Sequence, residues 1–111
     1  MTAIRRAGIK VGVGTDSVVS VGPLDLFAEM RAARALAGLS AEESLALGTV
    51  EAARLVELED QVGHLAPGAW GDVIVVDLGD RRHQPIEGVL AAGPPHVRLT
   101  IGSGRVAYRR E

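Results

Sequence analysis

The feature that most constrains the fold is a short apolar stretch near the start of the sequence, "IKVGVGTDS" at residues 9–17. Apart from Lys10, positions 9–14 hold apolar and small residues, a pattern typical of a strand buried on both faces in a parallel sheet. Such a strand needs neighbouring strands on both sides, but no other segment has the pattern of a second parallel strand. We therefore expect residues 9–14 to be one strand of a larger α/β structure, with Asp16 directly after it.

Three stretches of the first half are predicted to be helical: residues 2–7, 24–37 and 40–56. The first ends at Gly8, a usual C-terminal capping residue. The third begins with a capping box, in which Ser40 and Glu43 bond to each other's backbone. Gly48 lies inside this third helix, where glycine costs about 1 kcal/mol relative to alanine. Its presence there predicts close packing against a neighbouring element.

The second half has the character of a small β unit. We expect a strand over 73–76, a loop over 79–95 with one helical turn near 86–92, and a closing hairpin in "VRLTIGSGRVAY". These strands are too few to close a sheet. The sequence therefore divides into residues 1–58 and 59–111, and both parts are expected to belong to a larger structure.

Composition and charge exclude several classes of protein. The 111 residues include 12 Lys and Arg against 14 Asp and Glu, so the net charge of −2 gives no reason to expect binding to nucleic acid or to a membrane. No cysteine is present, which excludes disulfides and thiolate metal sites. No apolar run approaches the roughly 20 residues of a membrane-spanning helix, and the first residues lack the apolar centre of a signal peptide. A cytoplasmic location is expected.

Four motifs in a fixed order carry a resemblance to a known family. They are "GIKVGVGTDSVVSVGPLDLFAEMRAAR", "ALGTVEAARLV", "VGHLAPGAWGDVIVVDL" and "VRLTIGSGRVAY". Together they resemble the end of the metal-dependent amidohydrolases, in the branch of the cytosine, guanine and adenosine-type deaminases and the triazine hydrolases. The first motif is most similar to members of the aminodeoxyfutalosine-deaminase type.

The resemblance implies an α/β fold that is only part of an enzyme. Residues 1–58 would be the C-terminal piece of a (β/α)8 metal-hydrolase barrel, with its last strand and helices. Residues 59–111 would form part of a small β-sandwich that follows the barrel. The histidines of the family's first, fifth and sixth barrel strands have no counterpart, because His64, His83 and His96 lie in no such motif.

Asp16 is the residue to which the resemblance assigns chemistry. In the family an aspartate at this position holds a single Zn²⁺ or Fe²⁺ and takes a proton from a metal-activated water, which attacks the carbon that bears the amino group. The implied reaction is the hydrolytic deamination of a nucleobase, a nucleoside or a related small-molecule amine. Taken without the resemblance, Asp16 is better explained as a turn-forming or helix-capping residue after a strand. A single ligand cannot hold a catalytic metal, so the chain alone is expected to be inactive and to retain no metal.

Other polar residues carry weaker expectations. Ser17 and Ser20 are candidates to line a substrate pocket, although hydrogen bonds within the loop explain them as well. Asp72 is expected to hold a tight turn, and Trp70 to be a packing anchor. The three histidines are expected on the surface.

Two other functions fit the residues. The chain could be a truncated, non-catalytic binding or oligomerisation module derived from the same family. A phosphate-binding loop at "GVGTDS" is the third reading, but the lysine and the glycine spacing of a P-loop are missing. Because a lone strand and an incomplete sandwich leave apolar surfaces uncovered, we expect a homo-oligomer or a partner chain that completes the barrel.

Overall fold

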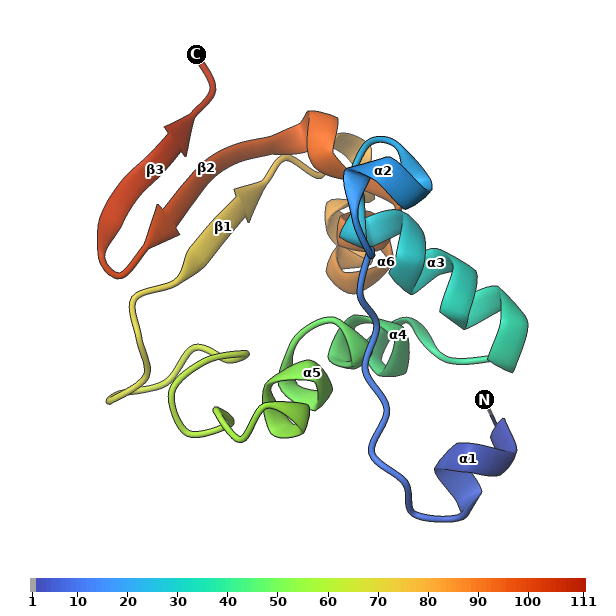
Figure 1. The fold of residues 1–111 in the computed structure, drawn as a ribbon. Coiled ribbons are helices and arrows are strands. Elements are labelled where there is room, and N and C mark those ends of the chain that lie inside the picture. Colours follow the sequence, from blue (N-terminus) through green and yellow to red (C-terminus); the bar gives the residue numbers. More distant parts are fainter. Residues whose placement is uncertain (1) are drawn as a thin grey trace.

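The computed structural model describes residues 2–111, except for the side chains of Ser20 and Val21. Its elements follow one another in the order α1 (Thr2–Arg6), α2 (Val18–Val21), α3 (Leu26–Ala37), α4 (Ala41–Leu47), α5 (Val50–Leu55), β1 (Val73–Val76), the 3₁₀ helix η1 (Gly79–His83), α6 (Pro85–Ala92), the 3₁₀ helix η2 (Pro94–His96), β2 (Val97–Gly102) and β3 (Arg105–Arg109). Figure 1 shows the helices gathered on one side and the sheet standing apart from them, with the two termini at opposite ends.

The core lies among α3, α4 and α6. Met30, Ala41 and Leu90 form one buried cluster, to which each of these helices contributes one residue. Beside it, the buried hydroxyl of Ser44 donates a hydrogen bond of 2.6 Å to the Met30 carbonyl and so joins α4 to α3. The division of the chain at residue 58 stays a prediction, but α6, from the second part, packs into the core of the first part.

The predicted helix over 40–56 is interrupted. α4 ends at Leu47 and α5 begins at Val50, because Thr49 has a non-helical backbone with φ −128° and ψ −96°. The capping box of Ser40 and Glu43 is present as predicted. The close packing predicted for Gly48 is also confirmed, since a Cβ there would lie 2.5 Å from the Met30 sulfur.

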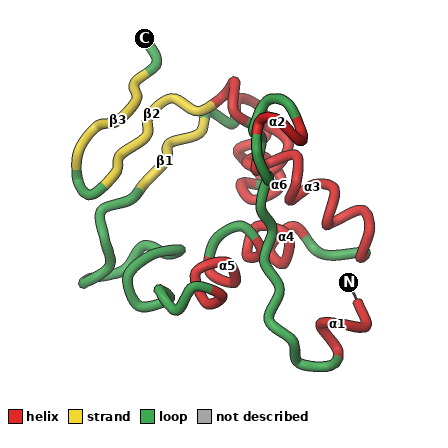
Figure 2. Tube along the Cα trace, in the orientation of Figure 1, coloured by secondary structure: helices red, strands yellow, loops and turns green. Residues whose placement is uncertain are grey.

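Residues 9–14 do not form the strand that the sequence predicts. They run as a loop beside α4 and α5 (Figures 1 and 2), and the Val13 N–H donates to the Leu47 carbonyl at 3.0 Å. Gly12 lies against α5, where a Cβ would come 2.7 Å from the Leu55 side chain. A strand is defined by a hydrogen-bonded neighbour, and within residues 2–111 no second strand lies beside this segment. Asp16 therefore follows a loop rather than the tip of a strand.

The sheet has three antiparallel strands in the order β1-β2-β3. The hairpin between β2 and β3 turns at Ser103 and Gly104, whose φ angles of 51° and 77° are both left-handed, as a two-residue hairpin loop requires. The Asp72 carboxylate accepts a hydrogen bond of 2.7 Å from the Ser103 N–H, which confirms that Asp72 holds a turn. Trp70, expected to be a packing anchor, is instead 51% exposed, because little of the chain covers this end of the sheet.

The segment predicted as a loop over 79–95 is largely helical. Pro85 starts α6, a favourable first position because proline has no N–H to leave unpaired. The helix runs to Ala92 and buries Leu90, so it is longer than the single helical turn that the sequence predicts. Among residues 2–111, no helix has both the length and the apolar character that crossing a bilayer requires.

Candidate functional site

Asp16 lies in the loop between the segment 9–14 and α2. Its φ is 60°, a left-handed conformation that aspartate tolerates better than most residues. One carboxylate oxygen accepts a hydrogen bond of 2.7 Å from the Ser17 N–H, and the Thr15 hydroxyl donates one of 3.1 Å to the Asp16 carbonyl. These local contacts fit the turn-forming explanation. The residue is also exposed, which leaves it accessible to a ligand.

The structure brings together only two of the three candidate site residues. Ser17 is adjacent to Asp16 in the same loop and is exposed. The side chain of Ser20 lies outside the described part of the structure, so its predicted contact with substrate stays a prediction. The roles of Asp16 and Ser17 in chemistry likewise stay predictions.

The residues of this chain do not by themselves make a metal site. Within the part of the chain that the structure describes, no three His, Cys, Asp or Glu side chains lie close enough to share a metal ion. The three histidines are exposed, as expected, and are spread over the second half. The nearest partner of the His64 ring is the Val62 carbonyl, 3.3 Å from Nδ1. Asp16 could therefore supply one ligand of a metal site and no more.

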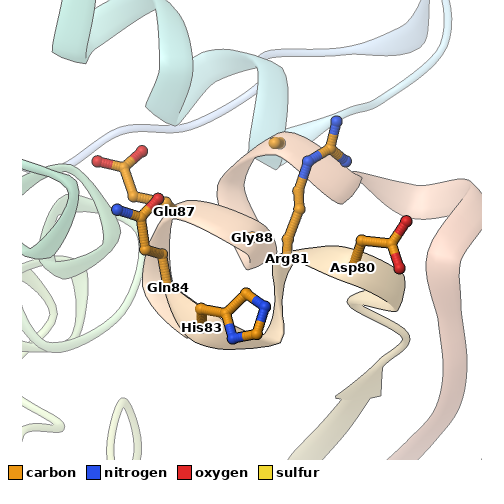
Figure 3. A pocket seen from close by; sticks show the side chains of 7 residues that line it. Asp80, Arg81, His83, Gln84, Glu87 and Gly88 are labelled. Carbon is orange, nitrogen blue, oxygen red and sulfur yellow. The ribbon is translucent and has the colours of Figure 1, made fainter.

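An open hollow of about 660 Å³ lies where η1 meets α6, and its lining residues are Asp80, Arg81, His83, Gln84, Glu87, Gly88 and Ala91. Figure 3 shows the His83 ring and the Gln84 amide at the turn, while the Arg81 guanidinium points away from them. Sequence reasoning did not identify this hollow, because its lining residues follow no motif and were assigned to a loop.

Of the two carboxylates that line this hollow, that of Glu87 is already engaged. Both oxygens of Glu87 accept hydrogen bonds of 2.6 Å from the Arg34 guanidinium of α3. These bonds lower the pKa of Glu87 and raise the pKa of Arg34. Glu87 is therefore a structural partner of α3 rather than an acid or base for a ligand. No local pattern could have paired two residues so far apart in the sequence.

Comparison with known proteins agrees with the four motifs. The family model described as "Amidohydrolase family" matches residues 2–106. A relative from Teredinibacter turnerae, named 5-methylthioadenosine/S-adenosylhomocysteine deaminase, is 37% identical over an alignment of 92 positions, which covers 76% of this chain and 21% of the relative. A relative of the same name from Bacillus thuringiensis (strain Al Hakam) is 40% identical over an alignment of 124 positions, which covers 98% of this chain and 28% of the relative.

Solved structures show the same arrangement of elements. An adenosine deaminase from Xanthomonas campestris with bound zinc is similar with a TM-score of 0.84 and 30% identity, over 97% of this chain and 28% of that one. The guanine deaminase of E. coli is similar with a TM-score of 0.81 and 23% identity, over 98% of this chain and 30% of that one. At this identity the similarity concerns the fold alone. The chain spans between about a fifth and a third of the proteins it matches. On the family match and these likenesses, the chain belongs to the amidohydrolase family.

Proposed function

We propose that this chain is the C-terminal segment of a metal-dependent deaminase. In this proposal residues 1–58 end a (β/α)8 barrel and residues 59–111 form part of the β-sandwich that follows it. The high TM-score over 28% of a zinc-bound deaminase supports the proposal. The segment 9–14 supports it as well, because its backbone has one hydrogen bond to α4 and no neighbouring strand within the described residues.

The reaction we propose for the complete enzyme is hydrolytic deamination, in which water replaces an amino group and ammonia leaves. The substrate class is an adenosine-type nucleoside, since the relatives with the names given above are deaminases of such compounds. The observation that carries the proposal is Asp16 itself. It is an exposed carboxylate in the Gly-Thr-Asp-Ser segment of a loop, within the region that matches the family.

Asp16 would supply one carboxylate ligand to a Zn²⁺ or Fe²⁺ whose remaining ligands come from residues outside this chain. Acidification of a water is the chemistry that such an ion supplies when bound. The part of Asp16 is to accept a proton at its carboxylate and return it to the departing amine. The hydrogen bond from the Ser17 N–H to one carboxylate oxygen would orient the Asp16 side chain before substrate arrives.

A chimera tests this role directly. Residues 2–111 would replace the matching segment of the Bacillus thuringiensis relative, and ammonia release from 5-methylthioadenosine would be measured together with bound metal. Asp16→Asn should lower kcat/KM by about 10²–10⁴-fold, the usual contribution of a positioned acid–base group, and should reduce the metal content. The control is Asp60→Asn, the same chemical change at another exposed aspartate.

Two results would count against the proposal. The first is a chimera that is active and insensitive to Asp16→Asn. The second is deaminase activity or stoichiometric zinc in the isolated chain, because Asp16 would then not be an incomplete site. A soluble, folded chimera without activity in either variant would favour the alternative function, a non-catalytic binding or oligomerisation module.

A further inference from the structure

The segment 9–14, which leads to Asp16, makes its closest approach to α5 at Gly12. A Cβ on this residue would lie 2.7 Å from the Leu55 side chain, 3.2 Å from the Ala52 Cα and 3.4 Å from the Leu47 carbonyl oxygen. The last two atoms belong to the backbone, so no side-chain rotation could move them aside. The φ of Gly12 is not positive. Glycine is therefore required at this position for the space it leaves rather than for its backbone conformation.

The break between α4 and α5 supplies the acceptor that holds the residue after Gly12. In an uninterrupted helix the Leu47 carbonyl would accept a hydrogen bond from the N–H of Glu51, four residues on. The non-helical backbone of Thr49 separates the two helices instead, and this carbonyl accepts a bond of 3.0 Å from the Val13 N–H. Leu47 is only 1% exposed, so Val13 pairs an acceptor that is buried from water.

Apolar packing completes the anchor. The valines on either side of Gly12, at positions 11 and 13, pack against a buried cluster that consists of Ala33, Leu39 and Leu47. Residues 11–13 are therefore held by a backbone hydrogen bond, by side-chain packing and by a close approach to α5. Asp16 follows Val13 by three residues, so the chain can carry it no more than about 11 Å from this anchor.

We propose that Gly12 is a positioning residue for the Asp16 carboxylate. The close approach at Gly12 brings Val13 to the Leu47 carbonyl, and this anchor sets where the loop that carries Asp16 begins. A side chain at position 12 would push the segment away from α5 and displace the carboxylate with it. Misplacement of a reacting group by about 1 Å can lower a rate about 100-fold. The inference rests on the role proposed above for Asp16, whereas the contacts of the anchor all lie within residues 2–111.

NMR and amide hydrogen exchange on the 111-residue chain test the anchor without an assay of activity. Gly12→Ala is compared with Gly88→Ala, the same change on α6. A Cβ at Gly88 would lie 3.1 Å from the Arg81 and Leu78 side chains and 3.2 Å from the Arg81 carbonyl oxygen. The control therefore introduces a clash of similar closeness away from the segment that leads to Asp16.

The two variants should differ at two amides. In Gly12→Ala the Val13 amide should exchange at least about tenfold faster than in the wild type, relative to the most protected amides of the same protein, because its bond opens locally. The Ser17 amide signal should also shift, since this N–H donates to the Asp16 carboxylate at 2.7 Å. In Gly88→Ala both amides should behave as in the wild type.

A second substitution should rescue the first. The atom nearest to the new methyl group belongs to Leu55, a residue that is 48% exposed. Gly12→Ala combined with Leu55→Ala should recover part of the Val13 protection and return the Ser17 signal toward its wild-type position. Leu55→Ala alone should change neither. A general loss of stability would not give this recovery, because destabilising changes that do not interact add.

The chimera described above tests the consequence for catalysis. Gly12→Ala should lower kcat per bound metal ion about 10–100-fold while KM changes less than about twofold, since the carboxylate acts on the reaction rather than on substrate binding. Gly88→Ala should lower kcat less than about twofold, because its clash does not reach the reacting groups.

The results separate a failure of this inference from a failure of the proposed function. If Asp16→Asn removes activity but Gly12→Ala behaves like Gly88→Ala, the proposed function stands and Gly12 is not a positioning residue. If the chimera is active and insensitive to Asp16→Asn, the proposed function fails, and the catalytic importance of Gly12 fails with it. Unchanged exchange at Val13 and an unchanged Ser17 signal in Gly12→Ala would overturn the inference whatever the activity of the chimera.

Discussion

The helical cluster of α3, α4 and α6 and the segment of residues 9–25 differ in how they are held. In the cluster, helices from distant parts of the sequence bury apolar side chains together, and Leu90 is only 2% exposed. Within the described residues, the segment that carries Asp16 has two backbone hydrogen bonds to α3 and α4, from the Val13 N–H to the Leu47 carbonyl and from the Glu29 N–H to the Asp25 carbonyl, apart from its bond back to α1. Val19 on α2 is 97% exposed.

This difference shows which part of the chain is held in place by contacts within the chain itself. The cluster satisfies its apolar and polar groups from within, through buried side chains and through the hydrogen bonds of Ser44 and Arg34. The segment 9–25 presents a candidate functional residue on a backbone with few contacts. The metal site proposed for Asp16 would depend on neighbours that residues 2–111 do not supply, whereas the cluster is held by contacts within those residues.

The largest effect is expected from truncating a core residue of the cluster. Leu90→Ala removes a buried side chain from between α3 and α4, and such changes cost about 2–5 kcal/mol because a cavity remains. Leu36→Ala removes the same atoms from a position on α3 that is 80% exposed, and should change the free energy of unfolding by less than about 0.5 kcal/mol. Urea denaturation followed by circular dichroism measures both. Equal effects would mean that the cluster is not the stable part of the chain.

A smaller effect is expected from adding a methyl group to a glycine. At Gly48 the new Cβ would lie 2.5 Å from the sulfur of buried Met30, and overpacking of this kind costs about 1–3 kcal/mol. At Gly14 nothing lies within 4 Å of a Cβ, so alanine should be neutral or should stabilise by up to about 1 kcal/mol through the unfolded chain. The difference between the two variants in urea midpoint measures how much tighter the cluster is. A larger loss at Gly14 would reverse the comparison.

Local sequence signals were sufficient for most of the fold. The helix expected over 24–37 is α3, and the capping box of Ser40 and Glu43 begins α4. The predicted hairpin is formed by β2 and β3, with the Gly-Ser-Gly sequence at its turn. Each of these signals lies within a few residues of the structure that it determines.

The features that the sequence did not predict depend on distant partners. Residues 9–14 have the composition of a buried strand, but a strand forms only beside another strand. The length of α6 depends on the packing of Leu90 against α3 and α4. It also depends on the ion pair between Glu87 and Arg34, which lie 53 residues apart in the sequence. For the site, the resemblance identified Asp16. Its role with a metal stays a prediction, because the described residues do not supply the further ligands that a metal ion would need.

The smallest effect is expected from removing the ion pair between Glu87 of α6 and Arg34 of α3. Glu87 accepts two hydrogen bonds from Arg34, which lower the pKa of its carboxyl below the ordinary value. A carboxyl whose pKa is lowered by folding stabilises the folded state above its unfolded pKa, about 4.3 for glutamate. That stabilisation is lost as the pH falls through the lower folded value.

Glu87→Gln should therefore unfold at a lower urea concentration than the wild type at pH 7, and the gap should close between about pH 5 and about pH 3. Asp77 and Glu43 also have lowered pKa values, from hydrogen bonds donated by the backbone of Gly79 and of Ser40. Because Asp77 and Glu43 are present in both proteins, the wild type and Glu87→Gln should both lose stability in acid. Only the difference in stability between the two proteins reports on Glu87. Glu59→Gln, at an exposed position, is the control and should show no gap at either pH. A gap for Glu87→Gln that stays constant with pH would mean that packing of the side chain, rather than its charge, joins α6 to α3.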